Sequence, residues 1–211
     1  MLPEAPRIID SLQGNGYGTL DFRLGGGMVL IFRFDHRVSK DIDVFIHDAQ
    51  ALGFLSPHLN DVAGMGLLEY QEQANALKFI LPLGDIDIIV AGNVTREQPG
   101  EALDFMGRRI PLDTTAEISA KKLLYRAESF KARDVFDMAV ALALDRPAAT
   151  KALQAAASTR TALLRRLQVL AEAPPAHLTR DLMLTKAGAA DAGGMVAILA
   201  QAVRDTAKGP P

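Results

Sequence analysis

Residues 24–45 read LGGGMVLIFRFDHRVSKDIDVF, and this stretch decides the fold. Six of the seven residues from Met28 to Phe34 are apolar. Because three glycines precede them, a turn followed by a buried helix is favoured over a strand. The segment from Ile42 to Ile46 is expected to form a strand, with Asp41 and Asp43 on one face and the apolar residues between them on the other.

The sequence on either side of this stretch predicts several more strands. In Asp85-Ile86-Asp87-Ile88 the carboxylates fall on one face of a strand and the isoleucines on the other. We also expect a helix over residues 5–13 and a partly helical segment from Asp48 to Asp61. The expected strands are Leu20–Leu24, Leu67–Glu72, Ala76–Leu81, Asp85–Val90 and Arg108–Leu112. This order of elements predicts an α/β or α+β sheet with helices packed on it, and of the two we expect the α+β fold, with a mixed sheet flanked by helices.

The chain changes character after Asp113, where it becomes rich in alanine and helical patterns. Thr114 and Glu117 have the spacing of a capping box, which marks the start of a helix. Further helices are expected over 131–144, 148–172 and 179–206, and a frayed tail over 208–211. We therefore divide the chain into a sheet domain, residues 1–113, and a helical C-terminal lobe, residues 114–211.

Composition excludes several classes of function. The chain has 211 residues and no cysteine, which excludes thiolate catalysis, cysteine zinc sites and disulfide scaffolds. It has no apolar stretch of about 18 residues and no secretory signal pattern, so we expect a cytoplasmic protein without a membrane span. Residues 1–100 carry 7 Lys and Arg against 13 Asp and Glu, whereas the remainder carries 16 against 12. An acidic half and a basic half favour a cation site together with an anion site, although an evenly solvated surface is the plainer interpretation.

The paired carboxylates and the glycine triplet together suggest a chemistry. Asp41 and Asp43 repel one another unless a cation neutralises them, and Mg²⁺ prefers such oxygen ligands. Asp87 offers a third carboxylate from another strand. A glycine turn that opens onto a helix suits a phosphate. Phosphoryl or nucleotidyl transfer needs both features, although a glycine triplet alone is more often a turn and an Asp-x-Asp pair more often a solvated strand end.

This opening stretch resembles that of nucleotidyltransferases of the DNA polymerase β type. It is most similar to the AbiEii-like abortive-infection toxins of type IV toxin–antitoxin pairs. Their motif runs from glycines and an apolar helix to Arg-x-Ser-x-Asp-x-Asp, matched here by Gly25–Gly27 and Arg37–Asp43. Gly84–Ile88 resembles the strand with the third metal carboxylate. Glu117–Leu144 resembles the family's helix pair, with Lys, Arg and Asp at matching positions. The matching segments span a little over half of the chain.

The resemblance implies an enzyme that transfers a nucleotide from an NTP to an acceptor hydroxyl and releases pyrophosphate. It implies two Mg²⁺ ions on Asp41, Asp43 and Asp87, an RNA acceptor, particularly tRNA, and a cognate antitoxin as partner. Arg37 and Ser39 would support the metal strand. The implied catalytic residues are Asp41, Asp43, Asp87, Lys122 and Asp134, and the implied nucleotide-binding residues are Gly25, Gly26, Gly27, Ser39, Lys122 and Arg126.

Met28 departs from the pattern, because the family has Ser or Thr there and Met cannot donate a hydrogen bond to a phosphate. Either the glycine N–H groups suffice, or nucleotide binding is weaker, or the chain is a catalytically silent nucleotide- or partner-binding remnant. A protein or small-molecule acceptor is another alternative to RNA.

Several other residues have plainer interpretations. Arg133 and Asp137 are interpreted as a surface salt bridge, and Lys121 is interpreted as a solvated charge. Tyr70, Tyr125 and Phe136 read as core. No two histidines have zinc-ligand spacing. The segment 151–186 carries six Lys and Arg against two acidic residues, which favours either an RNA-binding surface or an ordinary amphipathic bundle.

Overall fold

A computed structural model describes residues 4–14, 16–18, 20–105, 107–180, 182–185 and 194–207. The chain divides into two compact units. The sheet unit comprises Met1–Val29, Lys40–Gly92 and Pro99–Asp113, and the helical unit comprises Leu30–Ser39, Asn93–Gln98 and Thr114–Pro211. Both units are discontinuous in sequence, and the sheet unit ends at Asp113.

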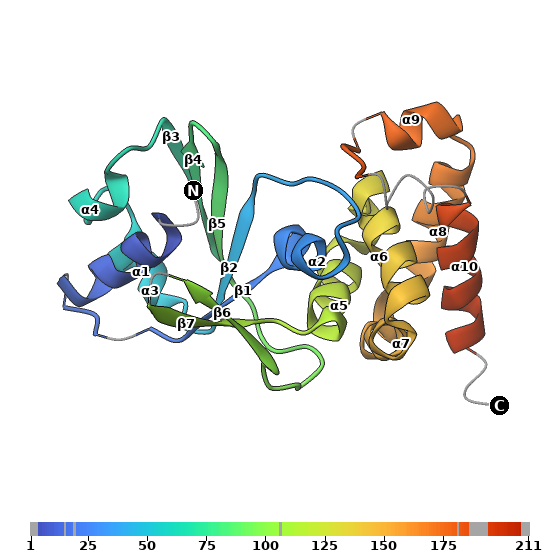
Figure 1. Cartoon of the computed structure of the whole chain (residues 1–211), viewed down its shortest axis with the longest axis horizontal. Helices are drawn as coiled ribbons and strands as arrows, with labels where there is room; N and C mark the ends of the chain where they lie inside the picture. The colour runs from blue at the N-terminus through green and yellow to red at the C-terminus, as the bar shows by residue number, and fades with distance from the viewer. Residues whose placement is uncertain are drawn as a thin grey trace. The chain divides into compact units, whose positions relative to one another are not determined.

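The sheet unit holds one mixed sheet of seven strands in the order β3-β4-β5-β2-β1-β7-β6 (Figure 1). The two inner pairs that matter most are β2 with β5, which is parallel, and β2 with β1, which is antiparallel. The strands are β1 (Phe22–Gly25), β2 (Ile42–Ile46), β3 (Glu69–Gln73), β4 (Ala76–Leu81), β5 (Gly84–Val90), β6 (Glu101–Phe105) and β7 (Arg108–Leu112). All the expected strands form, and β6 is one that sequence reasoning missed.

Alternating side chains give this sheet a buried apolar face. Ile42 lies opposite Ile86 and Val44 opposite Ile88 on the parallel pair, and all four side chains are buried. The residues between them face the other way, so that the same pairing also places two aspartates opposite each other.

Among the described residues, three helices belong wholly to the sheet unit: α1 (Glu4–Gly14), α3 (Gln50–Leu55) and α4 (Asp61–Gly64). α1 buries Ala5, Ile8, Ile9 and Leu12, the spacing of one helical face, and it packs against α3 and α4. Asn60 caps α4 by accepting a hydrogen bond from the Ala63 N–H at 3.0 Å. The segment from Asp48 to Asp61 is partly helical, as expected: it contains α3, and α4 begins at its last residue.

α2 (Gly26–Phe34) follows β1 directly, as the glycine triplet predicts. The other helices are α5 (Thr115–Arg126), η1 (Ala127–Ser129), α6 (Ala132–Leu144), α7 (Arg146–Ala155), η2 (Ala157–Thr159), α8 (Arg160–Ala171), α9 (Pro175–Thr179) and α10 (Met195–Thr206). The Thr114 hydroxyl accepts a hydrogen bond from the Glu117 N–H at 3.1 Å, which confirms Thr114 as the N-cap of α5. Among the described residues, no helix is long and apolar enough to span a membrane.

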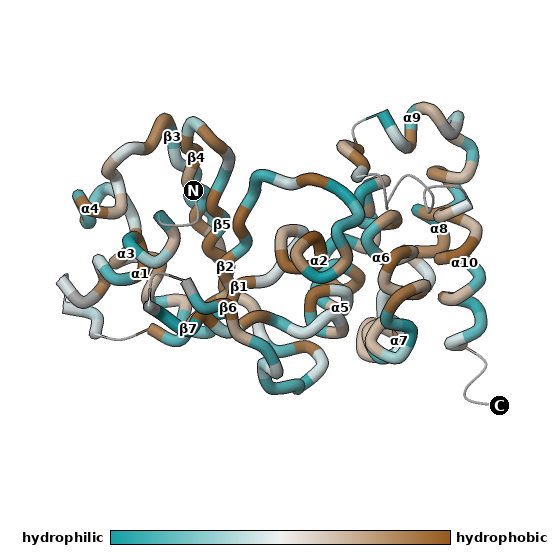
Figure 2. Tube along the Cα trace, viewed as in Figure 1, coloured by the Kyte–Doolittle hydropathy of each residue, from teal (hydrophilic) through white to brown (hydrophobic). Residues whose placement is uncertain are grey.

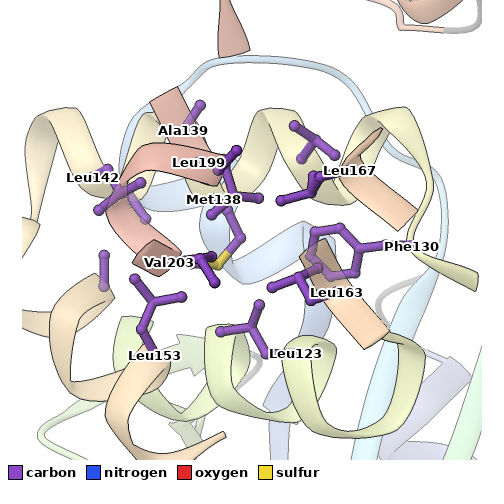
Figure 3. Close-up of a cluster of buried hydrophobic side chains, with 14 of the residues drawn as sticks. Leu123, Phe130, Met138, Ala139, Leu142, Leu153, Leu163, Leu167, Leu199 and Val203 are labelled. Atoms are coloured by element: carbon purple, nitrogen blue, oxygen red, sulfur yellow. The ribbon is translucent and has the colours of Figure 1, made fainter. Parts of the chain in front are cut away.

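The helical unit has its own hydrophobic core. Side chains from α5, α6, α7, α8 and α10 converge in it, and Figure 3 shows Met138, Leu163 and Leu199 pointing toward one another. Phe130 and Phe136 are fully buried there. Figure 2 shows hydrophobic and hydrophilic residues alternating along the C-terminal helices, which is the pattern of helices that bury one face.

Two expectations for the C-terminal half are wrong. The segment 148–172 is helical, as expected, and divides into α7 and α8 with η2 between them. The segment 179–206 is not one helix, because Leu184 forms a β-bridge with Arg37, and Gly194 starts α10 in the left-handed conformation with φ of 72°. Its residues 186–193, and the tail 208–211, lie outside the described residues. Tyr125 is 58% exposed and is not core, because it lies on the solvent side of α5.

Candidate functional site

The sheet unit brings two of the predicted aspartates, Asp43 and Asp87, together on one face. Asp43 on β2 lies directly opposite Asp87 on β5, and opposite Gly25 on β1. Asp41 lies one residue before β2 begins. Both Asp41 and Asp43 are close enough to Asp87 to raise its pKa by their negative charge.

The pKa of Asp87 lies above its ordinary value. Burial is the largest cause, and the charges of Asp43 and Asp41 add to it, while the ammonium of Lys78 opposes them. Ionised Asp87 is thus held in a position that disfavours its charge. Such a position is suited to a group that is neutralised by a cation.

Position 26 requires a glycine because of its backbone conformation and its closeness to Asp43. Its φ is +65°, a conformation that side chains rarely adopt, and a Cβ atom added there would lie 1.8 Å from Oδ2 of Asp43. At Gly25 an added Cβ would lie 2.6 Å from the Phe45 ring and 2.9 Å from the Asp113 carboxylate. The two glycines let the start of α2 approach the carboxylate strand closely, and Gly27 follows in the first turn of α2.

We expect Gly26→Ala to lower the free energy of unfolding by more than about 1 kcal/mol, because it combines a left-handed backbone with a collision on Asp43. Urea unfolding measures this change. The matched control is Gly53→Ala in α3, where an added Cβ meets nothing within 4 Å. That control should be neutral or stabilising by about 0.4–1 kcal/mol. Equal effects of the two substitutions would contradict the assigned role of Gly26.

Lys78 is a functional candidate that sequence reasoning missed. It lies on β4 directly opposite Asp87, and its Nζ atom lies 2.7 Å from Asp85 and 3.3 Å from each oxygen of Asp87. No sequence motif marks this lysine. The alternation in Ala76–Leu81 indicates that Lys78 lies on the polar face of its strand. Only the register of β4 on β5 shows that it lies opposite Asp87.

The donor set of the sheet unit fits a divalent cation by its chemistry. Asp43 and Asp87 lie opposite each other on neighbouring strands, Asp41 lies two residues before Asp43, and Gly26 leaves open the space beside Oδ2 of Asp43 that a Cβ would fill. Among the described residues, no group of three or more His, Cys, Asp or Glu side chains is placed so that it could hold a metal ion. One of the three carboxylates, that of Asp87, is instead engaged by Lys78.

The helical unit holds a second group of predicted residues. Lys122 on α5 donates hydrogen bonds to Asp134 at 2.7 Å and to Asp137 at 2.9 Å, both on α6. Asp134 also accepts a hydrogen bond from the Lys131 N–H and so caps α6. The Arg126 guanidinium lies 3.9 Å from Asp134 and is 42% exposed. Two of the three N–H donors of Lys122 are therefore taken by carboxylates.

Asp137 is the most heavily engaged of these residues, and its interpretation as half of a surface salt bridge is wrong. Its side chain is fully buried. Arg37 donates to it twice, at 2.6 and 2.9 Å, and His36 Nε2 lies 2.7 Å away. Arg37 therefore pairs with α6. Arg37 lies 100 residues away in the sequence, so no local pattern indicated the pair.

Charge–charge contacts dominate the electrostatics of this cluster. Burial alone would raise the pKa of Asp137, but Lys122, Arg37 and His36 hold it well below its usual range. Burial would lower the pKa of Lys122, but Asp137 and Asp134 raise it above the ordinary value. Both partners are thus ionised at neutral pH.

The remaining predicted residues are placed as follows. Ser39 is half-buried in the segment that leads into β2. Met28 is half-buried within α2. Lys121 is not a solvated charge: it is buried and lies 3.4 Å from the carboxylate of Glu117.

Comparison with known proteins identifies a matching family and several solved structures with a similar fold. A family model described as nucleotidyl transferase AbiEii toxin, type IV toxin–antitoxin system, matches residues 14–208. The nucleotidyltransferase toxin MenT4 from Mycobacterium tuberculosis H37Rv is 15% identical, with a TM-score of 0.53 over 98% of this chain and 82% of that one. At this identity the similarity shows a shared fold.

Two further solved structures are similar over most of their length. The antibiotic-resistance factor ANT(2'')-Ia is 16% identical, with a TM-score of 0.48 over 80% of this chain and 94% of that one. JHP933 from Helicobacter pylori is 14% identical, with a TM-score of 0.44 over 98% and 93%. No curated protein matches the sequence.

Proposed function

The chain belongs to the AbiEii family of nucleotidyltransferase toxins, and from this membership we propose that it transfers a nucleotide from an NTP to a hydroxyl group of RNA, particularly tRNA, in a Mg²⁺-dependent reaction. The protein is a nucleotidyltransferase with an α+β fold. As a member of a type IV toxin–antitoxin family, it has an NTP as substrate and an antitoxin as implied partner. The observation that carries the active-site proposal is the register of β2, which pairs Asp43 with Gly25 on one side and Asp87 on the other.

Asp41, Asp43 and Asp87 are the residues that would hold Mg²⁺. Bound there, the metal would lower the pKa of the acceptor hydroxyl and neutralise charge on the departing pyrophosphate. The close approach of Gly26 to Asp43 supports this assignment, because it brings the first turn of a helix next to the carboxylates.

The glycine triplet is proposed to bind the phosphates of the NTP. The first N–H groups of a helix have no acceptor within the helix, and they carry the positive end of its dipole. Gly26 and Gly27 form the first turn of the nine-residue α2, so their backbone N–H groups are donors for phosphate oxygens. The side chain of Met28 adds no hydrogen-bond donor, and we propose that the backbone donors suffice without one.

Two cationic groups of the helical unit are proposed to bind nucleotide phosphates. Lys122 retains one N–H donor after its contacts with Asp134 and Asp137, and Arg126 keeps a partly exposed guanidinium. Asp134 positions Lys122 by holding its amine at 2.7 Å. Ser39 is proposed to support the nucleotide site from the segment before β2.

An RNA acceptor is supported by the basic charge of the C-terminal helices. Arg165 and Arg180 are exposed and Arg160 is partly exposed, and such residues bind phosphates without regard to sequence. Aromatic residues make up 6% of the chain and there is no Trp, so recognition by base stacking is not expected.

Label transfer tests this function directly. Purified protein is incubated with total cellular RNA, Mg²⁺ and each NTP in turn, radiolabelled at the α-phosphate. Label is expected on RNA with the wild type and not with Asp41→Asn/Asp43→Asn. The labelled band then identifies the acceptor and the preferred nucleotide.

The absence of label on RNA with every NTP would overturn the RNA acceptor. Label on a protein or small molecule in the same reactions would retain nucleotidyl transfer and change the acceptor. If Met28→Ser alone gained transfer activity, Met28 would be the break in a silent site.

A further inference from the structure

Lys78 carries a positive charge into the group of acidic residues on the sheet. Its ammonium contacts Asp87 on one side, and Asp43 lies on the other side of Asp87 across the sheet. The three residues form a row over β2, β5 and β4 in which a single carboxylate lies between another carboxylate and an ammonium.

An ammonium and a metal ion compete for the same carboxylate oxygens. Nζ of Lys78 lies 3.3 Å from both oxygens of Asp87, so it faces the whole carboxylate rather than one lone pair. A divalent cation that approaches Asp87 is repelled by this fixed charge, and the repulsion is only partly screened because the lysine side chain is 29% exposed.

Asp85 provides an alternative partner for the same ammonium. It lies two residues before Asp87, on the same face of β5, and its Oδ2 atom lies 2.7 Å from Nζ. This contact is shorter than either contact with Asp87. Lys78 can therefore leave Asp87 and stay paired, without being moved into solvent.

We propose that Lys78 is an internal counter-ion that a divalent metal ion displaces from Asp87, and that Asp85 retains the displaced ammonium. The proposal rests on the proposed function, in that it takes Asp41, Asp43 and Asp87 as the metal ligands. In this arrangement Lys78 sets the metal concentration at which the carboxylates are loaded. Lys78 thus tunes the metal site without being one of its ligands.

Binding of Mn²⁺, followed by the loss of the electron paramagnetic resonance signal of the free ion, tests the proposal without any nucleotide or turnover. Lys78→Met is expected to bind Mn²⁺ about threefold to tenfold more tightly than the wild type, because one repelling charge is removed. Lys78→Arg keeps the charge and should bind no more tightly than the wild type.

Arg108→Met is the matched control for charge. It also removes one positive charge from the sheet unit, and Arg108 pairs with Asp10 in an exposed contact of 2.6 Å. Its Mn²⁺ affinity should stay within about twofold of the wild type, because exposed charges are screened.

Asp85→Asn tests the second half of the proposal. With Asp85 neutral, Lys78 is held by Asp87 alone, so Mn²⁺ should bind more weakly than to the wild type. The same substitution should have a smaller effect in a Lys78→Met background, where there is no ammonium to hold.

Weaker Mn²⁺ binding by Lys78→Met than by the wild type would overturn the proposal, since Lys78 would then hold Asp87 ready for the metal. Affinity equal to that of Arg108→Met would overturn it as well. Binding that survives Asp41→Asn/Asp43→Asn would place the ion elsewhere, which overturns both the ligand set and the proposal. Absence of binding in both the wild type and Lys78→Met has the same consequence, whereas nucleotidyl transfer to RNA is decided separately by the label-transfer experiment.

Discussion

Asp87→Asn is expected to lower nucleotidyl transfer by a factor on the order of 10³ or more while the protein remains as stable as the wild type. The loss of activity follows from the proposed metal site, because an amide is a poor ligand for Mg²⁺ and carries no negative charge. Transfer is measured with the α-labelled NTP, and stability is measured by urea unfolding at pH 7.

The expected stability follows from the sign of the pKa shift. Burial, together with Asp43 and Asp41, raises the pKa of Asp87, so ionised Asp87 costs free energy in the folded state relative to the unfolded chain. This cost is present at pH values above the raised pKa and is relieved as the pH falls through it. An uncharged amide removes the cost at pH 7, so the free energy of unfolding should be unchanged or higher.

Asp104→Asn is the matched control for this variant. Asp104 is an exposed residue of β6 in the same unit, and the same atom change there should leave transfer within about twofold of the wild type. Transfer by Asp87→Asn within tenfold of the wild type would remove Asp87 from the catalytic set. A large loss of stability would instead show that Asp87 serves the fold.

Asp137→Asn is expected to lower the free energy of unfolding by about 3–5 kcal/mol, the largest effect on stability that the structure predicts. The substitution leaves Arg37 and Lys122 buried without their shared counter-charge. Asparagine also turns an acceptor oxygen of Asp137 into a donor that faces other donors. Urea unfolding at pH 7 measures the loss.

The pH dependence gives this prediction a second readout. The pKa of Asp137 is far below its ordinary value, so its stabilising contribution is complete above the unfolded pKa of about 3.9 and is lost as the pH falls toward the folded pKa. The difference in stability between the wild type and Asp137→Asn should therefore shrink as the pH is lowered below about 4. A constant difference would assign the effect to packing.

Glu172→Gln provides the control, since it exchanges the same groups at an exposed residue of the helical unit. It should change the free energy of unfolding by no more than about 0.5 kcal/mol. A loss of less than about 1 kcal/mol in Asp137→Asn would contradict the assignment of Asp137 as the centre of the buried cluster.

Local patterns in the sequence were enough to predict the strands and the helix that carry the glycine triplet, Asp43 and Asp87. The glycine triplet before an apolar run predicted the start of α2, and the alternation around Asp87 predicted β5 with its carboxylates on one face. The family model confirms the resemblance that residues 24–45 and Glu117–Leu144 suggested. Each of these signals lies within a few residues of chain.

Contacts between distant segments could not be predicted in this way. The contacts of Lys78 with Asp85 and Asp87 follow from the register of β4 on β5, which the alternation of either strand leaves undetermined. The sequence suggested Arg133, four residues away, as the partner of Asp137. In the structure its partner is Arg37, which is distant in the sequence and joins the helical unit through the fold. Helices were expected over 148–172 and 179–206, but apolar periodicity does not reveal where a short 3-10 turn or a β-bridge interrupts them.

The division of the chain has a consequence for its synthesis. Every segment of the sheet unit has been made once residue 113 is reached, so the sheet with Asp43 and Asp87 can assemble on a growing chain. The helical unit takes in residues 30–39 but depends on residues beyond 113, and Arg37 has to wait 100 residues for Asp137. The residues of the aspartate site are therefore all synthesised before Lys122 is added, whereas the buried cluster lacks its central carboxylate until Asp137 has been added.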